Sequence, residues 1–242
     1  MKYNGLAAVG LVLLCFVTSA NAQDVSISLG DQDSLATRSV QLLALVTILS
    51  LVPGILIMVT CFPFLVTVLA ILRQAIGLQQ SPPNMLIVTL ALFLTYFIME
   101  PVFLESYELA IEPFSNNQMP LEEAFVTALE PFRVFMSGRI DPDTFFVLAE
   151  LRPDAETELS PSSSLSLLVP SFLLSEIERA FQIGFIIFLP FLIIDLVVAA
   201  VLMSMGMMMV PPAIVSLPFK LAFFVVADGW SLIASSLVRS YF

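Results

Sequence analysis

Long apolar runs set the pattern of the chain. The first runs from Ser39 to Leu72 without a charged residue. These 34 residues would measure about 51 Å as one straight helix, which is longer than the ~30 Å hydrocarbon core of a bilayer. We therefore expect breaks near Pro53-Gly54 and Pro63, because proline removes an amide donor and clashes with the preceding turn.

Three more apolar segments follow. The second spans Met85 to Met99 and is expected to close at Glu100-Pro101. The third and fourth cover residues 180–205 and 219–238, on either side of Pro211-Pro212. Four apolar segments of this length, divided by prolines and short polar turns, predict an all-α fold of membrane-associated helical hairpins.

The segments frame a polar insert and divide the mature chain into three parts. We assign residues 39–99 to a first apolar helical pair, 100–179 to the insert and 180–242 to a second hairpin. The insert is also expected to be helical, because apolar residues recur at steps of three and four: Leu121, Ala124, Phe125, Ala128, Leu129, Phe132 and Phe135. Asp141-Pro142 indicates another helix start.

The N-terminus has the features of a secretory signal. Lys2 precedes an apolar stretch from Leu6 to Val17, and small residues at Ala20 and Ala22 fit a cleavage site after Ala22. The alternative is an uncleaved membrane helix, although the stretch is short for a span. With residues 1–22 removed, residues 23–38 would form a short periplasmic segment.

Charge is concentrated in the insert. Residues 100–179 hold fifteen of the twenty acidic residues but four of the nine basic ones, so they carry the whole net charge of −11. The positive-inside rule places this insert outside the cytoplasm. An acidic surface is a poor match for phosphates, so we expect no nucleic-acid partner. We interpret its glutamates as a solvated face.

The sequence carries no enzyme signature. It has no histidine, no glycine-rich phosphate loop and no nucleophile elbow. One of its two cysteines, Cys15, lies in the predicted leader. We therefore expect neither catalysis nor a cofactor or metal.

Asp195 is a carboxylate within an apolar run, where it is costly unless it finds a partner. We predict an ion pair with Lys220 if the last two segments form a hairpin. Exchanging both charges should then restore what either single reversal destroys. The alternative is a proton or ion site, for which Asp228 is a further intramembrane charge.

Five of the eleven methionines lie between Met203 and Met209. They could be packing or lipid-facing residues, since methionine fills gaps in many contexts. Gly206 and Pro211-Pro212 instead favour a loop, from which thioether side chains could project into a passage. Copies of Met207, Met208 and Met209 around an axis, with Met203 and Met205 as further candidates, would form a soft apolar constriction.

These residues also carry a resemblance to a known family. The C-terminal third resembles the FliP family of flagellar type III export-gate proteins, from Pro170-Ser-Phe-Leu-Leu-Ser-Glu through Phe188-Leu-Pro-Phe-Leu-Ile-Ile-Asp, Met203-Ser-Met-Gly-Met-Met-Met and Leu217-Pro-Phe-Lys to Asp228-Gly-Trp. Leu72-Arg-Gln-Ala and Gln80-Ser-Pro-Pro-Asn match as well, so the likeness covers residues 40–240.

The resemblance implies a subunit of a protein-conducting pore in the bacterial inner membrane and on its periplasmic side, within the flagellar basal body. Such subunits form a ring, expected to be pentameric, with FliR-type and FliQ-type subunits, and they receive unfolded flagellar proteins. The positions of Met207, Met208 and Met209 imply a methionine gasket. Assembled members form a helical cone, so apolar surface is buried between subunits or exposed to lipid, which hydropathy does not distinguish.

Three alternatives stay open on the sequence. An ion- or solute-coupled transporter would use Asp195 and Asp228 to bind its coupling ion. A purely structural scaffold would need neither those residues nor the methionines. Virulence secretion proteins share much of the FliP pattern, but the leader and the long insert favour the flagellar branch.

Overall fold

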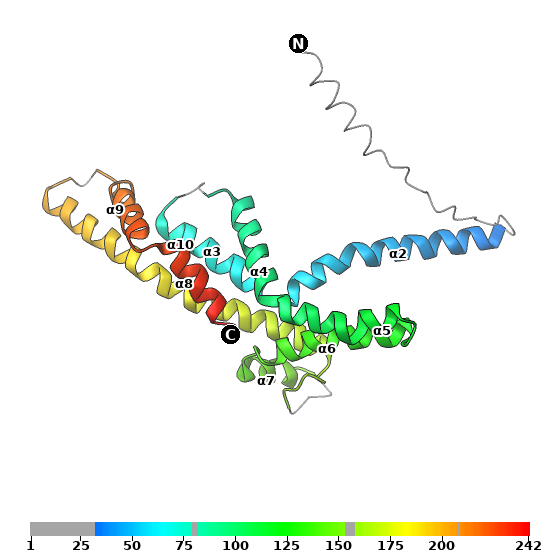
Figure 1. The fold of residues 1–242 in the computed structure, drawn as a ribbon. Coiled ribbons are helices and arrows are strands. Elements are labelled where there is room, and N and C mark those ends of the chain that lie inside the picture. The colour runs from blue at the N-terminus through cyan, green and yellow to red at the C-terminus, as the bar shows by residue number, and fades with distance from the viewer. Residues whose placement is uncertain (1–31, 79–81, 153–157, 208) are drawn as a thin grey trace, which may run out of the picture. The chain divides into compact units, whose positions relative to one another are not determined.

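The computed structural model is helical throughout the chain that it describes, without strands in those ranges (Figure 1). It describes residues 32–78, 82–152, 158–207 and 209–242. The all-α prediction is confirmed. The predicted leader and its cleavage site at Ala22 lie outside the described residues. The chain divides into two compact units, residues 1–49 and 50–242, and each is described by itself.

Helix α2 (Gln32–Met58) provides the described part of the first unit and the start of the second. It continues through Pro53, so the break predicted at Pro53-Gly54 is wrong. One lost hydrogen bond does not end a helix of 27 residues whose other backbone groups stay paired. Its residues from Arg38 to Met58 are all exposed.

Helix α3 (Phe62–Ile76) begins at the second predicted break. Pro63 lies in its first turn, where the missing amide hydrogen costs no helical bond. The helix ends at Gly77, whose φ of 87° lies in the left-handed region. Its side chains form much of the core of the second unit: Phe64, Leu65, Val68, Leu69, Leu72, Ala75 and Ile76 are buried.

Helix α4 (Asn84–Ser106) passes through Pro101, so the end predicted at Glu100-Pro101 is wrong. It continues into a π-helical turn, η1 (Tyr107–Ile111), and a short helix, α5 (Glu112–Ser115). The wide turn lies directly before Pro113, whose ring would collide with a carbonyl of a regular α-helix. The second apolar segment is thereby extended well into the predicted insert.

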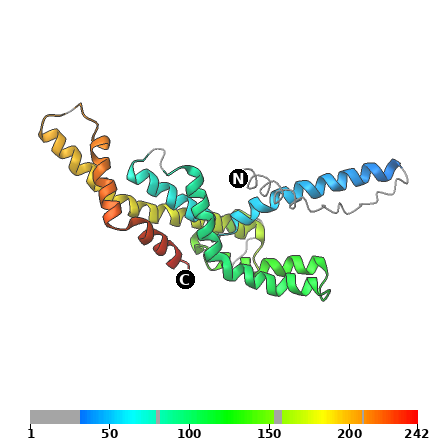
Figure 2. The same ribbon diagram turned by 45° about the horizontal axis from the view of Figure 1, so that its top comes forward.

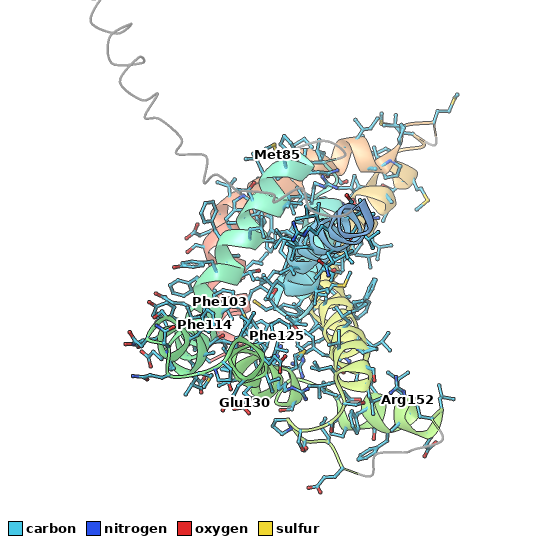
Figure 3. All side chains as sticks on the ribbon, turned by 90° about the vertical axis from the view of Figure 1, so that its right-hand side faces the viewer. Met85, Phe103, Phe114, Phe125, Glu130 and Arg152 are labelled. Atoms are coloured by element: carbon cyan, nitrogen blue, oxygen red, sulfur yellow. The ribbon has the colours of Figure 1, made fainter. Side chains whose placement is uncertain are left out.

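The rest of the insert contains the two predicted helices. Helix α6 (Leu121–Ser137) and helix α7 (Pro142–Glu150) begin where the sequence indicated. Asp141 caps α7 by accepting a hydrogen bond from the Thr144 amide at 3.0 Å. The apolar stripe of α6 is buried or half-buried apart from Leu121 and Phe125, which are exposed. Figure 3 labels Phe114, Phe125 and Glu130 on this part of the chain.

The last apolar region is longer than predicted. Helix α8 (Leu165–Ser204) starts fifteen residues before position 180, because Pro170 is tolerated inside it and the charge at Glu176 is neutralised by arginines. The return arm is helix α9 (Pro212–Val226), followed by helix α10 (Gly229–Arg239) after a bend of 61°. Its first helix begins at Pro212, not at 219.

Helices α3 and α8 lie side by side at the centre of the second unit (Figures 1 and 2). They approach closely at Gly184, where a Cβ atom would lie 2.5 Å from Ile71 Cδ1. In the described ranges, Arg38–Met58, Asn84–Ser115 and Leu165–Ser204 are long and apolar enough to cross a membrane. The bent pair α9 and α10 is a fourth candidate, which agrees with the four predicted segments.

Candidate functional site: the α8–α9 hairpin

The structure brings Asp195 of α8 and Lys220 of α9 together. The Lys220 ammonium Nζ lies 2.6 Å from Asp195 Oδ2. The side chain of Lys220 is 6% exposed and that of Asp195 is 36% exposed. Ser216 donates a hydrogen bond to Asp195 Oδ1 at 2.5 Å, and Lys220 Nζ donates another to the Ala75 carbonyl at 3.1 Å. The four groups therefore join α8, α9 and the end of α3.

The lysine is stabilised by two kinds of negative charge. One is the carboxylate of Asp195, and the other is the C-terminal end of α3, where unpaired carbonyls concentrate partial negative charge. Gly77 ends α3 in the left-handed region, and a Cβ atom there would lie 3.9 Å from Lys220 Nζ. A buried ammonium with these partners fixes geometry, and we infer a structural clamp.

The ion pair lies at nearly equal distances from the two ends of the connecting loop. Asp195 precedes the end of α8 by nine residues, and Lys220 follows the start of α9 by eight. At 1.5 Å per residue, each arm extends about 12–14 Å beyond the pair. The pair therefore fixes the register of the hairpin whose tip carries the methionines.

The hairpin tip begins with a helix stop that depends on glycine. Gly206 has φ of 74°, and its amide donates to the Met203 carbonyl at 3.0 Å. The Met207 amide donates to the Leu202 carbonyl, also at 3.0 Å. These two bonds form a Schellman motif, in which a left-handed residue satisfies the last carbonyls of a helix.

The described methionines of the tip are exposed. Met209 is 97% exposed and Met207 43%, and Met203 and Met205 are exposed as well. Met208 lies outside the described residues. The loop ends at Pro211, and Pro212 opens α9. Of the two alternatives left open by the sequence, the loop describes Met205, Met207 and Met209, which follow the end of α8, whereas Met203 lies in the last turn of α8.

An apolar groove of about 560 Å³ runs between α8 and α9 to the tip. Its lining includes Ile193, Val197, Val201, Met205, Met207 and Phe219. No residue of this lining is polar. The groove can hold an apolar side chain or an acyl chain, and its lining offers no oxygen or nitrogen side-chain ligand to an ion.

Asp228 is not part of the clamp. It lies exposed at the bend between α9 and α10, with φ of 48°, while the carboxylate of Asp195 is occupied by Ser216 and Lys220. Its strained backbone marks the break of the fourth apolar segment. The hydrogen bonds and ion pair of Asp195 therefore involve Ser216 and Lys220 and not Asp228.

Two features were missed by the sequence analysis. Ser216 lies four residues before Lys220 on the same helix face, a spacing that could have revealed it. Glu176 is fully buried, so the interpretation of the insert's glutamates as a solvated face is wrong there. It continues the buried stripe of α8 formed by Phe172, Ala180 and Gly184, which is the signal that could have identified it.

Comparison with known proteins agrees with the resemblance noted in the sequence. The model of the FliP family matches residues 45–237, which include the clamp, the tip and Asp228. The chain belongs to the FliP family.

Three FliP-family relatives match this chain over most of both lengths. The Caulobacter vibrioides "Flagellar biosynthetic protein FliP" is 49% identical over 236 residues, which is 98% of this chain and 88% of the relative. The protein of the same name from Bacillus subtilis is 47% identical over 205 residues, covering 85% and 93% of the two chains. That from Agrobacterium fabrum is 43% identical over 235 residues, covering 95% and 96%.

Proposed function

We propose that this chain is a core subunit of the flagellar protein export gate. Copies of it, in a ring that we expect to be pentameric, enclose a passage for unfolded flagellar subunits. Membership of the FliP family and the flagellar names of its relatives support this setting. The chain serves as a conduit and not as an enzyme, so the energy of transport must be coupled through partner proteins.

The observation that carries the proposal is the construction of the α8–α9 hairpin. Its tip presents exposed thioethers, whereas its neck is clamped by the ion pair of Asp195 and Lys220. A rigid neck places flexible apolar side chains at a defined position. Repeated around an axis, Met207, Met208 and Met209 would form a gasket, with Met203 and Met205 beside them. Such a constriction excludes hydrated ions yet reshapes around a sliding polypeptide.

The exposed apolar faces of α4, α8 and α9 supply surface for neighbours. Leu92, Phe93, Ile193 and Phe219 are examples of large side chains exposed in the single chain. We assign such surfaces to contacts with further copies, with FliR-type and FliQ-type subunits and with lipid. The assembly lies in the bacterial inner membrane and on its periplasmic side, where residues 100–179 extend.

Replacing the three gasket methionines by serine tests the proposal, with replacement by leucine as the matched control. The triple serine variant should assemble but leak ions and impair growth, because polar side chains let water enter the constriction. The triple leucine variant should keep the seal. A membrane-potential dye measures the leak, and co-purification measures assembly. A coupled transporter predicts lost transport without leak, and a scaffold predicts neither effect; either result contradicts the gasket.

A further inference from the structure

The C-terminal end of the chain is seated in a buried cluster. Tyr241 donates its phenol hydrogen bond to Glu176 Oε2, and the centre of its ring lies 4.0 Å from the Arg139 guanidinium carbon. The same ring stacks on Phe135 at 6.1 Å and meets the edge of Phe64 at 5.6 Å. Four separate parts of the second unit therefore meet at this one residue.

Glu176 is the centre of the cluster. Its side chain is fully buried on α8, and Oε1 lies 3.1 Å from Arg139 Nε and 3.0 Å from Arg139 Nη2. Arg179 Nη1 approaches the same oxygen at 3.7 Å. Arg139 also donates to the Ser240 carbonyl at 2.9 Å, so one guanidinium binds both the glutamate and the chain end. Burial raises the pKa of Tyr241, which keeps the phenol protonated as the donor.

Helix α10 packs on the core through Ile233 and Leu237, which are buried. An apolar groove of about 300 Å³ beside them is lined by residues of α8 and α10, among them Ile183 and Ile187. At the N-terminal end of α10, Gly229 lies against the ring of Phe224. Specific contacts therefore hold both ends of α10 in addition to this packing.

We infer that Tyr241 is a positioning residue, the C-terminal latch that holds α10 against α8 and couples the α9–α10 arm to the α6–α7 turn through Glu176 and Arg139. The coupling follows from connectivity. Arg139 lies in the turn between α6 and α7, and α10 leads through α9 back to the clamp at Lys220. A change at the turn can thereby reach the arm that follows the methionine tip.

Two matched pairs of variants separate the latch from general packing. Tyr241→Phe keeps the ring but removes the donor, whereas Tyr241→Leu removes the cation–π contact as well. Arg139→Lys loses the forked contacts to Glu176 and the Ser240 carbonyl. Arg133→Lys is its control, because Arg133 on α6 donates instead to the carbonyls of Pro161 and Ser163.

Hydrogen–deuterium exchange of the purified full chain in detergent tests the inference. Exchange in residues 229–242 should rise about tenfold in Tyr241→Phe and further in Tyr241→Leu, because a bond to a buried charged group is lost. Arg139→Lys should reproduce the effect from about a hundred residues away, and Arg133→Lys should not. Exchange of α3, whose Phe64 meets the Tyr241 ring, should rise less than that of α10 in the Tyr241 and Arg139 variants and stay unchanged in Arg133→Lys.

Two results would overturn the latch. One is unchanged exchange of α10 in Tyr241→Leu. The other is an equal rise in α3 and α10, which would reveal global loosening and not a local tie. Phe242→Ala supplies the baseline, because Phe242 is exposed at the chain end. The measurement involves no transport, so its failure would leave the export-gate proposal standing, and failure of the gate would leave the latch standing.

Discussion

Asp195 and Lys220 form an ion pair 2.6 Å apart that closes the neck of the α8–α9 hairpin. Only the lysine of this pair is well buried, and it also donates a hydrogen bond to the Ala75 carbonyl near the end of α3. The two charges are therefore unequal in their surroundings. This asymmetry decides what substitution of each should do.

Asp195→Asn should be more damaging than Lys220→Met. The first leaves a buried ammonium without its carboxylate, and breaking a buried pair in this way costs about 3–5 kcal/mol. The second leaves Asp195 with Ser216 and partial solvent exposure, so the free energy of unfolding should fall less. Thermal unfolding in detergent measures both, and the reverse order would contradict the clamp.

Exchanging the two charges should restore motility only in part. Asp195→Lys with Lys220→Asp rebuilds the attraction, but it places a carboxylate beside the Ala75 carbonyl at the negative end of α3. Motility of the double variant should therefore exceed that of either single reversal and remain below wild type. Full recovery would show that the contact with α3 contributes nothing.

Gly206→Ala should disturb the methionine tip. Its φ of 74° costs an L-residue with a Cβ about 1–2 kcal/mol, and the cost would be relieved by unwinding the Schellman motif. Gly206→Asn is the matched control, because asparagine enters the left-handed region more readily. Swimming-zone diameter at equal protein level checks the pair. Equal motility of the alanine variant and wild type would contradict a fixed tip.

Two glycines in helices should respond oppositely to alanine. A Cβ at Gly184 would lie 2.5 Å from Ile71 Cδ1 and 3.3 Å from its Cβ, so Gly184→Ala should force α3 and α8 apart and lower the melting temperature. Gly54 on α2 has nothing within 4 Å, and Gly54→Ala should stabilise the helix by about 0.5–1 kcal/mol. Melting curves of both variants in detergent test this contrast, and equal shifts would contradict it.

Cys61 should be unreactive in the folded chain. It is buried between α2 and α3, outside the candidate spans, and burial raises the pKa of its thiol from 9.0 to about 12. Its contribution to stability is thus complete below pH 9.0 and is lost as the pH rises toward 12. In a Cys15→Ser background, where Cys61 is the one cysteine of the sequence, a maleimide at pH 8 should label the chain only after unfolding in detergent and urea. Rapid labelling of the native chain would contradict this burial.

Much of the fold followed from local pattern. The starts of α3, α6 and α7 were predictable because Pro63, the acidic turn at Glu122 and Asp141-Pro142 act within one helical turn. The continuation of α2 through Pro53 and of α4 through Pro101 could not be predicted in this way. A long apolar helix tolerates one missing hydrogen bond, because the many other bonds and contacts of the helix keep it intact.

The candidate site was partly predictable for the same reason. A lone aspartate and a lone lysine in facing apolar segments have few partners, so their pairing could be predicted before the fold was known. The contact of Lys220 with the Ala75 carbonyl and that of Tyr241 with Glu176 join residues 145 and 65 positions apart in the chain. No spacing along the sequence records such contacts, although the buried stripe of α8 indicates that Glu176 faces inward.

The most direct test of the central claim is a cryo-EM image of the detergent-purified complex with its co-purifying small membrane proteins. The account predicts a ring whose axial passage is closed by the loops at residues 203–209, with the thioethers of Met207 and Met209 facing the axis. Loops turned toward the detergent belt, or a single chain with a cavity at the membrane midplane, would contradict it.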